Sequence, residues 1–405
     1  MNERWRDVAR ATGLVAADGS VRPTIFAEMS ALAARTGAAN LGQGFPDEDG
    51  PTWIRELAAR AALGGENQYP PGRGIAALRE AVAAHQARHY GIEVDPESEV
   101  LVTAGATEAL TAVILALAGP GDEVLTLEPF YDSHAAAIAM SGATHVTVPL
   151  VPGASGFRLN TAALDEAAGP RTRLILINTP HNPTGTVLTG DELAAIAAAA
   201  QRTGALVVTD EVYEHLTFDG AKHTPIAALP GMRERTVTIS SAGKTFSLTG
   251  WKIGWASGPA EAIDAMLTIK QFLTFSGGAP FQPAIARALT DGDADIAALR
   301  DTLGTRRDLL LHGLAEAGFT TMRPDGTYFV CADASPFVTD ERPDGAAFAS
   351  WLTEHVGVAC IPLAAFCREG SPTAAALANW VRFTFVKDEA TIRTALERLA
   401  ALKRS

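Results

Sequence analysis

The stretch EVLVTAGATEALTAVILALAGPGDEVLTLEPFYD, from Glu99 to Asp132, contains the pattern that decides the fold. A short apolar run, EVLVT, is followed by the segment ATEALTAVILALAG, which has helical periodicity and is rich in strong helix formers. A second apolar run, EVLTL, comes directly afterwards. This order predicts a strand, a crossover helix and a second strand parallel to the first.

The alternation of apolar runs and helix-like segments continues to about residue 258. Later runs are HVTVPL, RLILIN, ALVVTD, TVTIS and KIGWAS, and helix-like stretches such as GDELAAIAAAAQRTG lie between some of them. Repeated crossovers predict an α/β fold in which helices cover both faces of a mostly parallel sheet. Ligands of such sheets bind at the carboxyl ends of the strands, so residues directly after each run are the first candidates for a functional site.

The two ends of the chain show a different pattern. Residues 24–36 predict a helix that leads into the turn-rich segment NLGQGFPDEDGP, and the last hundred residues mix helices with the predicted strands TYFVCAD, GVACIPL and WVRFTFV. We therefore expect a large domain at residues 46–295. Residues 1–45 and 296–405 are expected to form a smaller α+β domain built from both chain ends.

Charge and hydropathy exclude several classes of partner. The 405 residues carry a formal net charge of −13, which argues against nucleic acid because binding it is driven by neutralising phosphates. The start of the chain is charged where a secretory signal has an apolar core, and no later apolar run is long enough to span a bilayer. We expect a cytoplasmic protein without a membrane or nucleic-acid partner.

The three cysteines, Cys331, Cys360 and Cys367, show no CxxC pairing and no regular spacing with histidine. Neither a zinc site nor a disulfide framework is indicated by such spacing. We expect all three to be packing residues, and we expect no metal.

Polar residues follow most of the predicted strands. Taken singly each has a structural explanation: GAT could be an ordinary turn before a helix, Asp210 a helix cap, and Asn182 before Pro183 a turn residue. Together they meet the needs of pyridoxal 5'-phosphate, namely a helix start for the phosphate, a ring to stack on, an acid for the ring nitrogen, donors for the ring oxygen, and an amine. The residues are Gly105, Ala106 and Thr107, then Tyr131, Asp210, Asn182 with Tyr213, and Lys244.

The amine comes from the segment SSAGKTFSLTGWKIGW, Ser240 to Trp255. A carbonyl cofactor requires an amine nucleophile, which a guanidinium cannot supply because it stays protonated. Lys244 is therefore the candidate for the covalent link. Lys252 is better interpreted as a positive charge for the phosphate, a role that lysine or arginine could fill. Either lysine alone could instead be a solvated surface residue.

Seven motifs, in order, carry a resemblance to a known family: NLGQGFPD, NQYPPGRG, GATEAL, PHNPTG, TDEVYEHL, SSAGKTFSLTGWKIGW and WVRFTFV. The chain resembles the class I aminotransferases of fold type I, which depend on pyridoxal 5'-phosphate. Within them it is most similar to the kynurenine, glutamine and methionine aminotransferases, and there to the actinobacterial enzymes assigned as N-succinyldiaminopimelate aminotransferases. The motifs extend from residue 41 to residue 386 and are more specific for the family than for the substrate.

The resemblance implies roles for individual residues. Lys244, Asp210 and Tyr213 would be catalytic, with Lys244 as both covalent anchor and proton carrier. The implied cofactor-binding set is Gly105, Ala106, Thr107, Tyr131, Asn182, Asp210, Tyr213, Ser241, Lys244 and Lys252, completed by Tyr69 from a neighbouring subunit of a homodimer. The implied substrate-binding set is Arg382, which would grip the α-carboxylate, together with Gly44, Asn182 and Phe26.

Two departures from the kynurenine group concern the substrate pocket. Phe26 stands where that group usually has tryptophan, and Gly277 and Gly278 stand where it tends to have bulkier side chains. These changes indicate either a wider pocket or a different loop conformation. A wide pocket would suit a long donor with a second carboxylate, for which Arg22 and Arg73 are candidate partners, although a solvated surface charge is the simpler interpretation of each.

The implied reaction moves an amino group from an L-amino acid, possibly N-succinyl-LL-2,6-diaminopimelate, to a 2-oxo acid such as 2-oxoglutarate. The motifs alone leave alternatives open. A cysteine-conjugate β-lyase shares the same chemistry up to the loss of the α-proton, and a kynurenine, methionine or glutamine aminotransferase would carry the same motifs. A cofactor-binding regulator on the same fold is a third reading, which an intact Lys244 and Asp210 count against.

Overall fold

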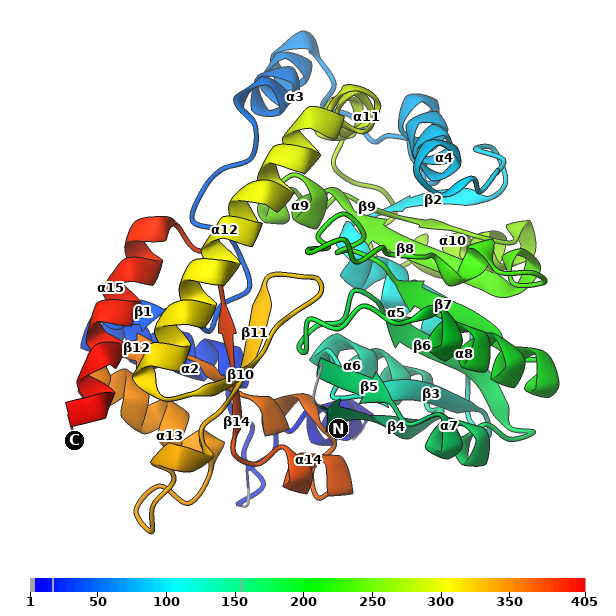
Figure 1. Ribbon diagram of the computed structural model, residues 1–405. Coiled ribbons are helices and arrows are strands. Elements are labelled where there is room, and N and C mark those ends of the chain that lie inside the picture. The colour runs from blue at the N-terminus through cyan, green and yellow to red at the C-terminus, as the bar shows by residue number, and fades with distance from the viewer. Residues whose placement is uncertain (1–3, 17, 154–155, 405) are drawn as a thin grey trace.

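The computed structural model describes residues 4–16, 18–153 and 156–404. A large twisted sheet with helices packed on both faces forms one part of the molecule, and a smaller part built from both chain ends lies beside it (Figure 1). Within the described residues, no helix combines the length and the apolar character that crossing a bilayer requires.

The large sheet has the strand order β2-β9-β8-β7-β6-β3-β4-β5. Its members are β2 (Val100–Thr103), β3 (Glu123–Glu128), β4 (Thr144–Gly153), β5 (Gly156–Leu159), β6 (Thr172–Asn178), β7 (Leu206–Asp210), β8 (Thr236–Ser241) and β9 (Gly254–Ser257). The pairings from β8 through β7, β6 and β3 to β4 are all parallel. The prediction of a mostly parallel sheet is therefore confirmed.

Two features of this sheet differ from a simple run of crossovers. The strand β9 is antiparallel to both of its neighbours, and β4 turns back into β5 as an antiparallel pair. In addition, β2 and β3 are not adjacent, because four strands lie between them. The alternation in the sequence gives the strand direction, but it does not give the spatial order.

Helices cover the sheet because its strands are apolar on both faces. In β6, Leu174 and Leu176 belong to one buried cluster while Ile175 and Ile177 belong to the other, as the two-residue alternation of a strand requires. The helices of this part are α3 (Thr52–Gly64), α4 (Ala76–Tyr90), α5 (Gly105–Leu117), α6 (Asp132–Ser141), α7 (Thr161–Ala167), α8 (Gly190–Thr203), α9 (Ala242–Thr245), α10 (Ala260–Lys270) and α11 (Gln282–Asp291).

The helix α8 shows why these segments begin and end where they do. The Thr189 side chain accepts a hydrogen bond from the backbone of Glu192, and the Glu192 side chain accepts one from the backbone of Thr189, which forms a capping box. The helix ends at Gly204, whose φ of 75° is the left-handed conformation that glycine adopts most easily.

The smaller part joins both chain ends. Residues 39–40 of β1 (Ala39–Asn40) pair with β12 (Val358–Ala359), and a second sheet has the order β10-β11-β14-β13. Its strands are β10 (Thr320–Met322), β11 (Phe329–Asp333), β13 (Ile361–Pro362) and β14 (Trp380–Thr384). Its helices are α2 (Ile25–Thr36), α12 (Asp293–Ala317), α13 (Gly345–Trp351), α14 (Pro372–Ala376) and α15 (Glu389–Leu399).

The helix predicted at residues 24–36 is confirmed as α2, which Thr24 caps with its side chain. The first helix, α1 (Arg4–Ala11), packs against α6 and so touches the large part, although residues 1–45 were expected in the smaller domain. The exact domain boundaries stay a prediction.

Candidate active site

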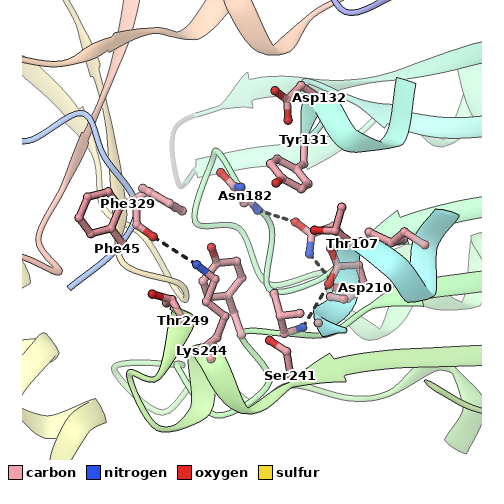
Figure 2. Close-up of a pocket in the computed structure, with 18 of the residues that line it drawn as sticks. Phe45, Thr107, Tyr131, Asp132, Asn182, Asp210, Ser241, Lys244, Thr249 and Phe329 are labelled. Carbon is pink, nitrogen blue, oxygen red and sulfur yellow. Dashed lines mark hydrogen bonds between the residues drawn. The ribbon is translucent and has the colours of Figure 1, made fainter. Parts of the chain in front are cut away.

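A cavity of about 310 Å³ is lined by residues at the ends of the central strands and by residues of the small part, such as Phe26 and Arg382. Thirteen of the residues expected at the site line it, and Figure 2 shows several of them pointing toward one another. They are Phe26, Gly44, Gly105, Ala106, Thr107, Tyr131, Asn182, Asp210, Tyr213, Ser241, Lys244, Lys252 and Arg382.

One end of the cavity is suited to a phosphate. The helix α5 begins there, and Ala104 provides no side-chain cap for its first amides, so these N–H groups are available to an anion. A Cβ placed on Gly105 would lie 3.2 Å from the Nζ atom of Lys252, which puts the ammonium beside the helix start. Thr107 and Ser241 line the same cavity with hydroxyl groups.

Glycine is required where β9 passes the start of α5. A Cβ on Gly254 would lie 2.6 Å from the carbonyl carbon of Gly105 and 2.8 Å from the amide nitrogen of Ala106, distances that no side chain tolerates. The close approach brings Lys252, two residues earlier, to the helix start. Lys252 adopts a φ of 54°, an uncommon conformation for a residue other than glycine.

Asp210 ends β7 and projects into the cavity with only 4% of its surface exposed. Its Oδ1 accepts a hydrogen bond of 3.3 Å from the amide of Val212, and its Oδ2 lies 3.7 Å from the Nε2 of His134. The His134 Nε2 is itself buried and has no hydrogen-bond partner among the described residues. A carboxylate held in this way is suited to pair with a protonated ring nitrogen.

Two tyrosines of the cavity remain protonated. Burial raises the pKa of Tyr131 to about 12 and raises the pKa of Tyr213 well above its usual value. Both hydroxyls are therefore hydrogen-bond donors at neutral pH. Tyr131 precedes α6 and offers a ring face to the cavity (Figure 2). Tyr213 lines the same cavity three residues after Asp210.

Lys244 lies on the short helix α9, directly after β8. Its Nζ donates to the hydroxyl of Tyr328 at 2.6 Å and to the carbonyl of Gly44 at 3.2 Å. The Tyr328 hydroxyl in turn donates to the same carbonyl at 2.6 Å. No ion pair holds Lys244 among the described contacts, so its amine faces the cavity with neutral partners.

Arg382 lies on β14 and is 2% exposed. Its Nη1 donates to the Oδ1 of Asn182 at 2.9 Å and its Nη2 donates to the carbonyl of Gly42 at 2.8 Å, whereas its Nε is buried without a partner. Burial lowers the pKa of Arg382 to about 10, so it stays charged. None of the salt bridges within the described residues includes it. A buried cation without a counter-ion indicates that an anion binds there.

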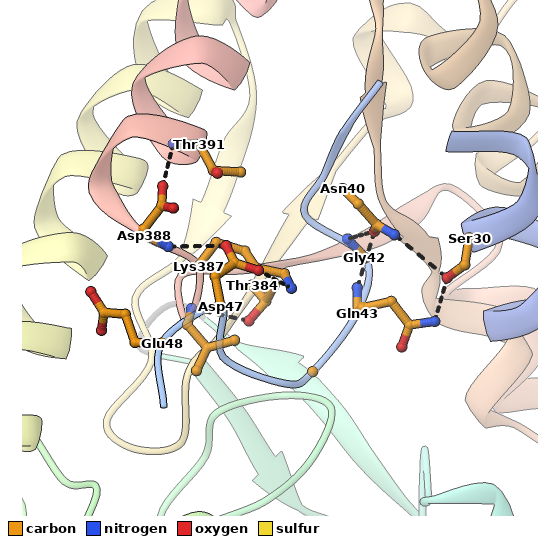
Figure 3. A network of polar contacts seen from close by, with 12 residues as sticks. Ser30, Asn40, Gly42, Gln43, Asp47, Glu48, Thr384, Lys387, Asp388 and Thr391 are labelled. Carbon is orange, nitrogen blue, oxygen red and sulfur yellow. Dashed lines mark hydrogen bonds and ion pairs between the residues drawn. The ribbon is translucent and has the colours of Figure 1, made fainter. Parts of the chain in front are cut away.

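The segment from residue 41 to residue 48 contributes Gln43, Gly44 and Phe45 to the cavity lining. Polar contacts fix this segment at both ends (Figure 3). At one end the Oδ1 of Asn40 accepts from the amides of Gly42 and Gln43, at 3.0 and 3.3 Å. At the other end the Nζ of Lys387 donates to the Oδ1 of Asp47 at 2.8 Å. These contacts place the carbonyls of residues 42 and 44 against Arg382 and Lys244.

Several residues of the site were missed at the sequence level. Tyr328 was interpreted only as part of a strand, yet its hydroxyl contacts the lysine amine; a tyrosine directly before a buried strand was the available signal. Cavity-lining residues that had no earlier role are Gln43, Phe45, Leu110, Asp132, Asn178, Val212, Gly243, Thr249, Ile253 and Phe329. The ring centroid of Phe329 lies 4.0 Å from the guanidinium carbon of Arg382, and no local motif predicts such a contact.

Tyr69 lies away from its own chain's cavity. It is 80% exposed and packs edge-on against Phe275, with ring centroids 5.3 Å apart. Its expected role therefore depends on a second subunit and stays a prediction.

The departures expected to widen the pocket have different explanations. Phe26 does line the cavity and lies 5.5 Å from the Arg382 guanidinium carbon. Gly278, in contrast, has a φ of 69°, and a Cβ there would lie 2.2 Å from the Cδ1 of Ile253. The loop conformation therefore explains this glycine, and neither it nor Gly277 is among the cavity-lining residues.

The two arginines suggested for a second substrate carboxylate also differ. Arg73 is engaged with the carboxylate of Asp264 and donates to the carbonyl of Ser98 at 3.1 Å, which argues against a substrate role. Arg22 is exposed, and its Nε donates to the carbonyl of Gly13 at 2.8 Å. Arg22 remains available to an anion through its other nitrogens.

The three cysteines are free, as expected; Cys331 and Cys360 are buried and Cys367 is partly buried. Burial raises the pKa of Cys331 to about 12, which keeps its thiol protonated and unreactive.

The donor set of the cavity fits a phosphorylated pyridine aldehyde. A helix start with a lysine, a buried carboxylate, protonated tyrosines and a lysine amine without an acidic partner each match one part of such a molecule. A comparison with family models matches residues 36–399 to "Aminotransferase class I and II". The chain belongs to this family. It is an aminotransferase, as the sequence motifs predicted, and its family uses pyridoxal 5'-phosphate.

Individual relatives agree with this assignment. The aminotransferase is 56% identical over 383 residues, 94% of its length and 96% of the relative's, to the Mycobacterium tuberculosis protein named "Probable N-succinyldiaminopimelate aminotransferase". It is 42% identical to the methionine aminotransferase of Escherichia coli, over 94% of this chain and 96% of that one. The solved structure of N-succinyldiaminopimelate aminotransferase from Mycobacterium tuberculosis matches with a TM-score of 0.92 and 53% identity, covering 99% of this chain and 100% of that one. These names give no support to the β-lyase alternative.

Proposed function

We propose that this aminotransferase binds pyridoxal 5'-phosphate through Lys244 and transfers the amino group of N-succinyl-LL-2,6-diaminopimelate to 2-oxoglutarate. The observation that carries the proposal is one cavity that holds a lysine amine, a buried acid and a buried guanidinium with no acidic partner among the described residues. These groups serve the cofactor aldehyde, the ring nitrogen and the substrate carboxylate, respectively.

The cofactor would be held along its whole length. The amides at the start of α5, the hydroxyls of Thr107 and Ser241, and Lys252 would bind the phosphate. Asp210 would pair with the ring nitrogen, Asn182 and Tyr213 would donate to the ring oxygen, and Tyr131 would stack on the ring. When bound, the cofactor supplies an electrophilic carbon and an electron-withdrawing ring that stabilises negative charge on the substrate.

The protein's own groups would position the substrate and move its protons. Arg382 would orient the α-carboxylate with two parallel N–H donors. The Lys244 amine would carry the proton that leaves the substrate α-carbon, and Tyr328, which contacts this amine at 2.6 Å, would hold it in place. Phe45 and Phe329 border the cavity and would exclude water from the reacting atoms (Figure 2).

The donor is supported by the 56% identity to the mycobacterial relative and by one available cation. N-succinyl-LL-2,6-diaminopimelate ends in a second carboxylate, which needs a charged partner if it is bound out of water. Arg22 lies just before α2, the helix that brings Phe26 to the cavity. It is the candidate for this second carboxylate.

A homodimer with shared sites is part of the proposal. Tyr69, Phe272, Leu273 and Phe275 are exposed by 80, 87, 44 and 40%, and exposed apolar side chains of this density mark protein interfaces. Tyr69 of one subunit would then reach the phosphate in the other. Mixing Lys244→Ala and Tyr69→Ala subunits should regenerate one intact site per hybrid dimer. Recovery of activity on mixing supports sharing, and none at all contradicts it.

We propose that the large domain, residues 46–295, and the small domain, residues 1–45 and 296–405, each form one half of the substrate site. The large domain would hold the cofactor, and the small domain would contribute Phe26, Gly44 and Arg382. We also propose that the enzyme acts in the cytoplasm, with amino acids and 2-oxoglutarate as its substrates.

The donor is tested by measuring glutamate formed from 2-oxoglutarate. N-succinyl-LL-2,6-diaminopimelate should exceed methionine, glutamine and kynurenine in kcat/KM. Arg22→Ala should raise KM for the succinylated donor and leave methionine unaffected, whereas the matched surface variant Arg35→Ala, on α2, should change neither. Higher kcat/KM for methionine or glutamine would refute the donor while leaving the cofactor assignment intact.

A further inference from the structure

Three imidazoles gather outside the active site, where α4 meets the turn that follows β7. His85 and His89 lie one helical turn apart on α4, and His215 comes five residues after the end of β7. One ring nitrogen from each residue can be chosen so that all three lie within 4.8 Å of one another. The Nε2 atoms of His85 and His215 are only 2.8 Å apart.

We propose that His85, His89 and His215 bind a divalent transition metal ion of the zinc class. Neutral imidazole nitrogen is a preferred ligand of zinc and its neighbours in the periodic table. Two histidines at positions i and i+4 of a helix present their rings on one face, as in other helical zinc sites. Cysteine spacing indicates no metal, but these three histidines come from two separate segments that no local spacing relates.

The distances are close to what zinc needs. Zinc–nitrogen bonds of about 2.0–2.1 Å in a tetrahedral site place the ligand nitrogens about 3.4 Å apart. The His85–His215 pair would open by about 0.6 Å, and no other pair would have to close by more than about 1.4 Å. His89 keeps 26% of its side chain exposed, so it is free to make most of this adjustment.

Metal binding would break few contacts of the buried His85 ring. His85 is 1% exposed, and its Nδ1 has no hydrogen-bond partner among the described residues. Its one recorded hydrogen bond joins it to His215, so a metal between the two rings displaces a single interaction.

The surroundings give a metal ion access and place carboxylates beside the histidines. His89 and His215 line a second cavity of about 760 Å³, separate from the active site, so the ion can enter and a water molecule can occupy the remaining coordination position. The Asp293 Oδ1 lies 3.4 Å from the Nε2 of His89, and Glu214, which is 4% exposed, directly precedes His215. Acids beside ligand histidines orient the rings and balance the charge of the metal.

A metal at this position would tie α4 to the turn that carries Tyr213. His215 lies two residues after Tyr213, whose side chain faces the active site from the other side of the same turn. We therefore expect the ion to stabilise the folded enzyme rather than to take part in amino transfer.

The test uses the cofactor-loaded enzyme without an affinity tag, after dialysis against a chelator. Zinc chloride is titrated in competition with a chromophoric chelator, and cobalt(II) is added separately to record the visible bands of a four-coordinate site. We expect one equivalent of zinc per chain and a zinc-dependent rise in Tm. His89→Ala should weaken binding by more than about tenfold, because even the loss of an outer-shell partner costs about 10–100-fold.

Two further variants make the result decisive. His85→Gln should also weaken zinc binding. His312→Ala removes an exposed histidine of α12 that is not part of the three-histidine cluster, so it should leave zinc binding unchanged. If His85→Gln does not fold, the exposed position of His89 still provides the test. Zinc binding that is absent in the wild type, or equal in wild type and His89→Ala, overturns the proposal.

Discussion

Replacing Arg382 by methionine tests whether a buried charge is kept for the substrate rather than for the fold. Most buried arginines in proteins have a partner. Arg79, for example, is 7% exposed and donates to Glu97 at 2.7 Å and to the carbonyls of Pro96 and Gly74 at 2.8 and 2.7 Å. Arg382 has no acidic partner among the described residues and leaves its Nε unpaired. The two residues should respond in opposite ways to the same substitution.

The magnitude follows from the contacts of Arg382. A pKa lowered by burial to about 10, from an ordinary value of about 12.5, corresponds to about 3 kcal/mol of unfavourable free energy for holding the charge in the folded protein. Methionine removes this penalty. It also removes the donors to Gly42 and Asn182, at about 1–3 kcal/mol each. The two effects nearly cancel, so the free energy of unfolding should stay within about 2 kcal/mol of wild type.

Catalysis should suffer far more than stability. Two hydrogen bonds to a substrate carboxylate contribute about 3–6 kcal/mol together, since each charged hydrogen bond is worth about 1.5–3 kcal/mol. The loss in kcat/KM should therefore be about 10²–10⁴-fold. It should affect the amino acid and the 2-oxo acid alike, because both present a carboxylate to the same guanidinium.

The assay compares kcat/KM of both half-reactions and Tm for Arg382→Met and Arg79→Met. Arg79→Met should lower Tm, because two backbone carbonyls lose their donor, and should leave both KM values unchanged. A loss of less than tenfold in kcat/KM for Arg382→Met would place the carboxylate site elsewhere. A fall in Tm as large as that of Arg79→Met would show that the guanidinium is structural.

Three further variants examine the cofactor end of the site. Borohydride reduction of the wild type should fix the cofactor on Lys244, and Lys244→Ala should lose both the label and the activity; a label found on Lys252 by peptide mapping would overturn the assignment. Asp210→Asn should still show bound cofactor in its absorption spectrum but lose most of its turnover, because an amide cannot stabilise a protonated ring nitrogen. Wild-type rates in this variant would mean that the ring nitrogen has another partner. Tyr328→Phe should lower kcat by about tenfold, which corresponds to about 1.4 kcal/mol for one hydrogen bond to the Lys244 amine, with little change in KM; an unchanged kcat would show that the contact does not position the amine.

The fold was largely predictable because local patterns determine it. The apolar runs between residues 98 and 258 became strands, and the helix at residues 24–36 begins at its Thr24 cap. Strand order was not predictable. Whether β9 runs antiparallel beside β2 depends on packing across the sheet, for example the close approach of Gly254 to Gly105, and single-sequence periodicity carries no information on such contacts.

The site was predictable where residues follow strand ends, and less so where they meet across domains. Asp210, Lys244 and Tyr131 stand next to recognisable strands, and the cavity joins them. The contact between Lys244 and Tyr328 joins segments 84 residues apart, so no local spacing could reveal it. The proposed metal ligands illustrate the same limit, because His215 is distant in sequence from the helical pair that it meets.

The proposed cofactor groups and the proposed donor groups stand on different structural elements. This separation would explain why relatives with the same fold are named for different amino donors. Lys244 and Asp210 stand on elements of the buried central sheet, whose strands pack on both faces and resist movement. Phe26 stands instead on a helix of the small part, beside an exposed segment that contains Arg22. If Phe26 and Arg22 border the donor, as proposed, a substitution in that segment would change the surroundings of the donor side chain without disturbing the strand ends. Selectivity for the donor could therefore change while the proposed proton-transfer groups stay fixed.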